Sequence, residues 1–211
     1  MLSPRLPYWF AALLFAALLS ACGSAPTVSA SQTLQAPTER VQALRLVYHK
    51  AKMKTVSTTS YNPRNLSLEV GDTGIDRFGP LVVQRAPAIF AAAQVQVPQA
   101  TVMEDELLTL YLLRAVQQPP QDDGPRHLLV IGPHSGRVQA TSASTITSYV
   151  FLARLIDLQA KKTVWQAQID TKAWKGTDFV MRNFEGPTYN DSYAAELLQA
   201  VLRQMQSDGL I

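Results

Sequence analysis

The sequence contains a single cysteine, Cys22, among 211 residues. No disulfide can therefore form within one chain, and the stability of the fold must come from core packing. Histidine is almost as scarce. The three histidines, His49, His127 and His134, lie far apart, and none has the spacing of a zinc-binding pair. We therefore expect no metal site and no cofactor.

Charge of either sign is sparse. The 19 Lys and Arg residues against 16 Asp and Glu residues give a net charge of +3, which falls to +2 if Arg5 leaves with the first 21 residues. So small an excess, without a long run of like charges, does not predict nucleic-acid binding. No glycine-rich phosphate-binding pattern precedes a helix, so nucleotide binding is not indicated either.

Long apolar runs are absent except near the N-terminus. There, Arg5 is followed by an apolar run from Pro7 to Leu19. A helix that spans a bilayer needs ~20 consecutive apolar residues. This run is shorter, follows a positive charge and ends in small residues, which is the layout of a secretory signal peptide. We predict that residues 1–21 are a cleaved signal peptide.

The residues that close this run, Leu19-Ser20-Ala21-Cys22, resemble the lipobox of the bacterial lipoproteins. The resemblance implies cleavage before Cys22, a diacylglycerol on its sulfur and an acyl group such as palmitate on the new amino terminus. These acyl chains are the membrane attachment that we expect. Gly23 and Ser24 follow the cysteine, as in lipoproteins that are sorted to the outer membrane. We therefore expect a periplasm-facing domain on the outer membrane, or on the outer leaflet of the inner membrane if sorting differs.

Composition divides the mature chain into two parts. Residues 22–40 are small, polar and interrupted by proline, which predicts a flexible tether after the acylated cysteine. Such a coil would hold the domain about 20–25 Å from the anchor. Residues 41–211 show regular apolar patterns and have the length of a single domain.

The apolar patterns from residue 41 onward predict both strands and helices. Alternation predicts strands at 42–49 and 127–131, the second ended by Gly132-Pro133, and a hairpin of 145–157 with 163–170. Helices are predicted at 79–93, where Pro87 should kink or divide the helix, and at 191–206, where Gly209 should end it. The run 107–113 fits a buried strand, and periodicity alone leaves a short helix open.

These elements predict a single α+β domain. Its sheet should be antiparallel or mixed, with about five strands, and the two main helices should lie on one face. Residues 57–76 carry several turn signals around a short strand at 66–70. We expect a long loop there, and long loops inside compact domains often carry function.

Groups that could support hydrolysis are few. Ser135 follows His134, but adjacent residues in a loop do not provide a base that a third group orients. Glu104, Asp105 and Glu106 could supply paired carboxylates for glycan hydrolysis. Three acids in a row before a strand are more typical of a solvated strand end. We therefore predict no catalytic residues and no enzyme.

Aromatic residues near the C-terminus are better candidates for a binding surface. Trp165 lies on an alternating strand and is expected in the core. Trp174, Phe179 and Phe184 lie in the loop-like stretch 171–189, next to glycine and mixed charge. We predict that these three residues contact a partner.

The stretch Leu155–Ala167, followed by the closing helix, resembles small bacterial envelope lipoproteins. In these lipoproteins an apolar strand ends in Asp, a short lysine-containing turn follows, and a Val-Trp strand leads to a closing helix. The corresponding residues of this chain are Asp157, the turn with Lys161 and Lys162, and Val164-Trp165. Such lipoproteins include accessory proteins similar to the amino-terminal domain of TolB and the penicillin-binding-protein activators. The resemblance implies a non-enzymatic protein that docks onto a partner in transport, export or wall synthesis. Two alternatives stay open: a periplasmic module that binds lipid or peptidoglycan fragments in an apolar pocket, and, less favoured, an envelope hydrolase.

Overall fold

The computed structural model describes residues 26–35, 39–51, 54–59, 62–68, 78–117, 124–140, 145–171, 174–175 and 191–211. Its elements follow one another in the order β1 (Thr27–Thr33), β2 (Ala43–Lys50), β3 (Lys54–Thr59), β4 (Asn62–Leu68), α2 (Phe78–Ala91), β5 (Gln96–Glu104), α3 (Asp105–Gln117), β6 (His127–Ala140), β7 (Thr145–Asp157), β8 (Lys162–Asp170), β9 (Trp174–Lys175) and α4 (Asp191–Ser207).

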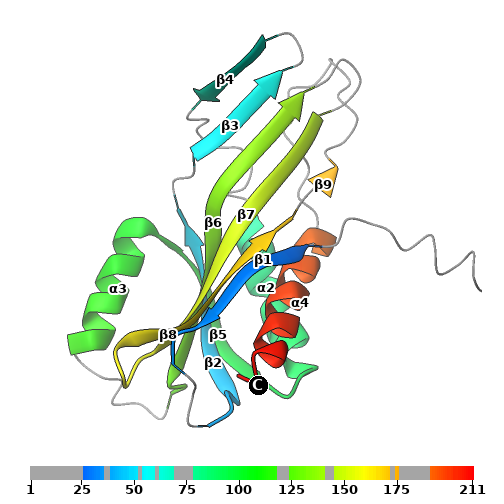
Figure 1. The fold of residues 1–211 in the computed structure, drawn as a ribbon. Coiled ribbons are helices and arrows are strands. Elements are labelled where there is room, and N and C mark those ends of the chain that lie inside the picture. Colours follow the sequence, from blue (N-terminus) through cyan, green and yellow to red (C-terminus); the bar gives the residue numbers. More distant parts are fainter. Residues whose placement is uncertain are drawn as a thin grey trace, which may run out of the picture.

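The described strands form one mixed sheet (Figure 1). Its main path is β1-β8-β7-β6-β2-β5, while β3 pairs with β6 and β4, and β9 pairs with β7. β2 is parallel to both β5 and β6, whereas β6, β7, β8 and β1 are successively antiparallel. The predicted α+β class with a mixed sheet is confirmed, and the sheet has nine strands in place of about five.

Helices α2 and α4 cover one face of the sheet, as predicted (Figure 1). The stripe of α4 is confirmed, because Leu197, Val201 and Met205 are fully buried. On α2, Val82 and Phe90 are buried against the same cluster. The central strands supply alternate residues to this face, namely Leu44, Leu46 and Tyr48 of β2, Leu129 and Ile131 of β6, and Tyr149, Phe151, Ala153 and Leu155 of β7.

The expected division of the first helix at Pro87 is wrong, because α2 runs from Phe78 to Ala91 without interruption. Pro87 lies on the exposed side of α2. Proline has no N–H to donate to the carbonyl one turn earlier in the helix. Because this side of α2 faces solvent, water can bind the carbonyl that lacks this hydrogen bond.

The predicted hairpin is confirmed as β7 and β8, which pair antiparallel from Val150–Asp170 to Asp157–Lys162. Trp165 on β8 is fully buried, as expected. Its indole N–H donates a hydrogen bond of 2.7 Å to Oδ2 of Asp208, just beyond α4. The hairpin is thus fastened to the closing helix by a polar contact as well as by packing.

The predicted end of α4 at Gly209 is also confirmed. Gly209 has a φ of 72°, in the left-handed region that glycine tolerates without steric cost. The Leu210 N–H donates to the Met205 carbonyl at 2.9 Å, and the Gly209 N–H donates to the Gln206 carbonyl at 3.0 Å. These two bonds form a Schellman motif, which folds the buried Leu210 back onto the last helical turn.

The expected strand at 107–113 is wrong, because these residues belong to α3, which lies on the opposite face of the sheet from α2 and α4 (Figure 1). Leu108, Tyr111 and Leu112 face the sheet with the spacing of one helix side. Asp105 and Glu106 occupy the first turn, where negative charge stabilises the positive end of the helix dipole. The alternative of a short helix is therefore the correct one.

The predicted tether is wrong for residues 27–33, which form β1 and pair antiparallel with β8 from Thr27–Asp170 to Thr33–Trp165. Only Val28 in this segment is a large apolar residue, so its composition is that of a linker. The hydrogen bonds of the β8 edge recruit it into the sheet, and its outer side chains remain exposed.

The predicted end of a strand at Gly132-Pro133 is wrong as well, since β6 continues to Ala140. A β-bulge between Pro133 and Ser135 leaves His134 as the extra residue. On its other side, β6 pairs with β2 up to Ile131 and with β3 only from Ser135. Pro133 thus falls in the gap between two partners, where a missing N–H is tolerated.

The expected loop at 57–76 begins as regular structure. β3 and β4 pair antiparallel from Thr55–Leu68 to Thr59–Asn62, and β3 is added parallel to β6. The short strand expected at 66–70 is the end of β4. Residues 69–76 lie outside the described residues.

Candidate functional site

Most residues that the sequence singles out for attachment or partner contact lie outside the described part of the chain. This holds for Cys22, Phe179 and Phe184. Trp174 is placed as the first residue of β9, opposite Thr147 of β7. Acylation of Cys22 and partner contact by these three aromatic residues stay predictions. Among the described residues, no helix is both long enough and apolar enough to cross a bilayer.

The acidic residues considered for hydrolysis lie at the junction of β5 and α3. Glu104 ends β5, and Asp105 and Glu106 begin α3. All three side chains are exposed, as expected for a solvated strand end. Asp105 forms an ion pair with His49 of β2. These positions are explained by the start of a helix, and a glycosidase would instead need one carboxyl held in an apolar site.

His134, the other residue considered for hydrolysis, is exposed in the bulge of β6 and does not lie in a loop. Within the described ranges, no group of three or more His, Cys, Asp and Glu residues could hold a metal ion. Among the described residues, Glu104, Asp105, Glu106 and His134 do not form an arrangement of nucleophile, base and orienting group.

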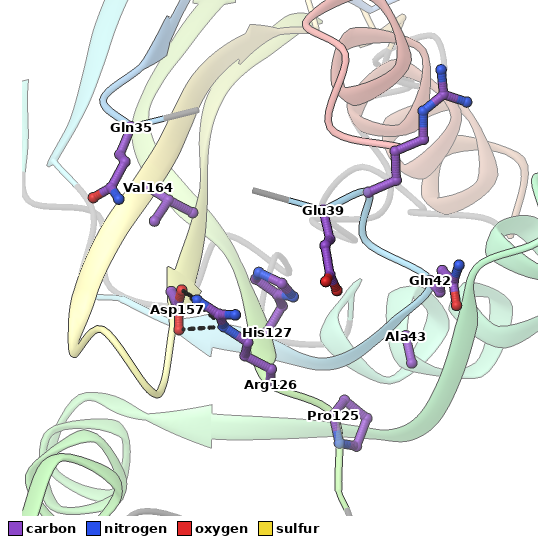
Figure 2. A pocket seen from close by; sticks show the side chains of 10 residues that line it. Gln35, Glu39, Gln42, Ala43, Pro125, Arg126, His127, Asp157 and Val164 are labelled. Carbon is purple, nitrogen blue, oxygen red and sulfur yellow. Dashed lines mark hydrogen bonds and ion pairs between the residues drawn. The ribbon is translucent and has the colours of Figure 1, made fainter. Parts of the chain in front are cut away.

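A cavity of about 570 Å³ lies where β2 and β6 begin and β7 ends (Figure 2). Most of its lining residues are polar or charged. They are Gln35, Glu39, Arg40, Gln42, Ala43, Pro125, Arg126, His127, Asp157 and Val164.

The buried charge of this cavity is the carboxylate of Asp157, which is 5% exposed. Arg126 Nε donates to both of its oxygens at 3.0 Å, and Nη2 donates to Oδ2 at 2.5 Å. The backbone N–H groups of Gln159 and Ala160 donate to Oδ1 at 2.9 and 3.0 Å. Burial raises the pKa of Asp157, but the bonds from Arg126 and the two amides outweigh it and lower the pKa to about 2.

This network holds the β7–β8 turn against the start of β6. The Leu158 N–H also donates to the carbonyl of Arg126 at 3.0 Å. His127, which is half-buried beside the network, has its pKa lowered by burial, while the charge of Asp157 opposes that shift. Arg126 and Asp157, two of the charged residues on the cavity wall, are therefore engaged in fastening the fold.

The outer side of α3 is the most unusual described surface. Three of the four large hydrophobic residues left exposed in the described ranges lie on this helix, with Leu107 58%, Leu110 53% and Leu113 52% exposed. We call these three residues the α3 leucine face. Their spacing of three residues places them along one side of the helix.

The opposite side of α3 fixes the orientation of this face. Leu108 is 3% exposed and packs with Val47 of β2 and with Leu128 and Val130 of β6. Arg45 Nη1 donates to the hydroxyl oxygen of Tyr111 at 3.4 Å. Because this side of α3 is held by the sheet, the leucine face is presented to solvent and cannot turn inward.

Sequence reasoning missed the leucine face because a run of leucines is expected to be buried on all sides. The acids Asp105 and Glu106, followed by apolar residues, were the signal for a helix start. No signal in the sequence distinguishes the leucines that pack on the sheet from those that do not.

No family model and no curated protein matches the chain. A PelC dodecamer from Paraburkholderia phytofirmans is 14% identical, with 84% of this chain and 94% of that chain covered and a TM-score of 0.42. Lipoprotein GNA1162 from Neisseria meningitidis is also 14% identical, with coverages of 78% and 99% and a TM-score of 0.36. Protein XCC0632 from Xanthomonas campestris is 9% identical, with coverages of 84% and 95% and a TM-score of 0.39. TM-scores this low carry no inference about function or partners.

Proposed function

We propose that this chain is a lipid-anchored, non-enzymatic accessory protein of the bacterial envelope that docks onto a protein partner through the α3 leucine face. The observation that carries the proposal is the exposure of Leu107, Leu110 and Leu113, each more than half exposed on a helix whose other side is fixed. The lipobox resemblance ending at Cys22 supports the anchor, and Gly23 and Ser24 after the cysteine support the outer-membrane address.

The chemistry of the face favours a protein over a lipid surface. Leucines at successive turns of a helix are typical anchors for an apolar groove in a partner. A helix that lies on a membrane carries lysine and arginine on its polar side. The first turn of α3 is instead acidic, with Asp105 and Glu106, and would be repelled by anionic headgroups.

The cavity beside Asp157 supports the alternative of a ligand-binding module less well. That alternative expects an apolar pocket for lipid or peptidoglycan fragments. Seven of the ten residues that line the cavity are polar or charged, and the ion pair of Arg126 and Asp157 fastens the β7–β8 turn. We therefore place the function on the α3 leucine face.

Photo-crosslinking in living cells tests the docking proposal. A crosslinking amino acid at position 114 replaces an exposed arginine on the same side of α3 as the leucines. We expect it to capture one envelope protein. The double variant Leu110→Ser, Leu113→Ser should lower this capture about tenfold or more, since burying a leucine contributes about 1.5–3 kcal/mol.

A matched control places the crosslinker at position 203, an exposed arginine of α4 on the other side of the sheet, where we expect no such product. Capture that persists in the double variant would show that the leucines do not form the contact. A product that consists of two copies of this chain would identify the partner as a second copy.

A further inference from the structure

The α3 leucine face is bordered by one acidic and one basic side chain. Glu106 lies in the first turn of α3 and Arg114 in its last turn, and both are exposed. Neither side chain forms an ion pair with another described residue. Each charge is therefore available to a second molecule that covers the leucines.

The positions of these five residues are symmetric about the middle of the helix. Leu110 lies at the centre. Leu107 and Leu113 lie three residues away on either side, and Glu106 and Arg114 lie four residues away. Residues spaced by three or four lie on one side of a helix. If a second α3 is laid over the first in the reverse direction, the acidic end of each helix therefore meets the basic end of the other.

The four-residue spacing sets the geometry of such a pairing. Glu106, Leu110 and Arg114 form one row on the surface of α3, in steps of four residues. Two helices whose rows of this kind interdigitate cross at about 50°, the commonest packing class in globular proteins. With a two-fold axis between the two Leu110 side chains, Glu106 of each copy faces Arg114 of the other. Leu107 and Leu113 lie on either side of this row, at the level of Leu110, and enlarge the apolar centre.

We infer that two copies of this chain associate through their α3 leucine faces, with a two-fold axis at Leu110 and two Glu106–Arg114 pairs between the copies. This inference rests on the docking face of the proposed function and names its partner as a second copy. An interface on a two-fold axis uses the same patch twice, so the patch must complement itself. The α3 leucine face does so in both apolar contact and charge. One pair of short helices buries little area, and we therefore expect a dissociation constant in the micromolar range.

The same charges also suit α3 as a single helix. Acids stabilise the first turn and bases the last turn through the helix dipole. The dipole acts within one molecule, whereas an interface makes the effect of each charge depend on the residue that the other copy presents. A charge reversal that breaks the interface should therefore be rescued by a second reversal at the facing position.

Analytical ultracentrifugation of charge-reversal variants tests this dependence. Residues 22–211 contain every described residue, and Cys22→Ser removes the only thiol. We expect this protein to form a reversible dimer. Glu106→Arg and Arg114→Glu should each weaken the association about tenfold or more, because like charges then face one another at both ends of the interface. An equal mixture of the two variants should dimerise again, because one variant is basic at both positions and the other is acidic at both.

Two further variants complete the experiment. Arg203→Glu reverses an exposed charge on α4, across the sheet from α3, and should leave the dimer unchanged. The double variant Leu110→Ser, Leu113→Ser should be monomeric, and circular dichroism checks that every variant is folded. The inference is overturned if the starting protein stays monomeric, if the mixture dimerises no better than either charge variant alone, or if Arg203→Glu weakens the dimer equally.

The outcomes separate this inference from the proposed function. In cells, a crosslinker at position 114 removes the attraction of Arg114 but adds no repulsion, so the leucine contact should still be captured. Leucine-dependent capture of a different envelope protein, by a chain that is monomeric in the ultracentrifuge, would disprove only the second copy as partner. A monomer that captures no protein and floats with phosphatidylcholine vesicles would overturn both proposals. A dimer that follows the charge pattern, with a free natural thiol at Cys22, would disprove only the anchor.

Discussion

The two faces of the sheet are covered to different degrees. On the α2–α4 face, two helices bury all six aromatic side chains that are fully buried in the described ranges, namely Tyr48, Phe78, Phe90, Tyr149, Phe151 and Trp165. On the α3 face, one helix buries a small aliphatic cluster of Val47, Leu108, Leu128, Val130, Ile156 and Leu158. The first face has a core of large interlocking rings, whereas the second is only partly covered.

This difference suggests a division of roles. Stability depends mainly on the α2–α4 face, so the α3 face can keep apolar residues in water for a partner.

The largest expected effect is on the α2–α4 face. Phe151 is fully buried, and its ring centroid lies 5.7 Å from that of Phe78 on α2. We expect Phe151→Ala to lower the free energy of unfolding by about 3–5 kcal/mol, because it removes a large buried ring and leaves a cavity. Urea denaturation measures this loss. Phe151→Leu, which preserves more of the volume, should cost clearly less, and equal costs for the two variants would contradict the ring-based core.

Some of the elements that form the two faces of the sheet could be predicted from the sequence. Alternation on both arms identified the β7–β8 hairpin, and the stripe of α4 together with Gly209 identified the closing helix with its end. These signals are local, because each element shows one apolar side and one polar side within its own residues.

The remaining elements depend on contacts that are distant in sequence. β1 has linker composition and becomes a strand only because β8 offers an open edge. β6 passes through Pro133 because its partner changes from β2 to β3 at that point. α3 has leucines on both of its sides, which conceals its period, and for that reason the exposed leucines of the candidate site were not predicted.

An intermediate effect is expected where the β7–β8 turn supports the α3 face. Asp157 lies between Ile156 and Leu158 of the aliphatic cluster, and its pKa falls from 3.8 to about 2 in the folded state. Because the folded-state pKa is lowered, this stabilisation is present above pH 3.8 and is lost as the pH falls toward 2. We expect Asp157→Asn to cost about 2 kcal/mol at neutral pH.

Urea denaturation of wild type and Asp157→Asn at several pH values measures the difference. The two proteins should converge in stability as the pH approaches about 2, because the wild-type carboxylate is then protonated. A difference that does not change with pH would show that the charge of Asp157 contributes nothing, and that the cost arises from altered packing.

The smallest effect on stability is expected on the α3 leucine face itself, and it sharpens the comparison most. Leu110 is 53% exposed, so Leu110→Ser should change the free energy of unfolding by no more than about 0.5 kcal/mol, mainly through helix propensity. Leu108 is only 3% exposed, so the matched variant Leu108→Ser should instead lower the free energy of unfolding by about 2–5 kcal/mol, because it removes a buried side chain from the cluster under α3. Thermal denaturation of both variants measures this contrast. If Leu110→Ser were as damaging as Leu108→Ser, the leucine would be packed within the folded protein, and the partner surface proposed on α3 would not exist.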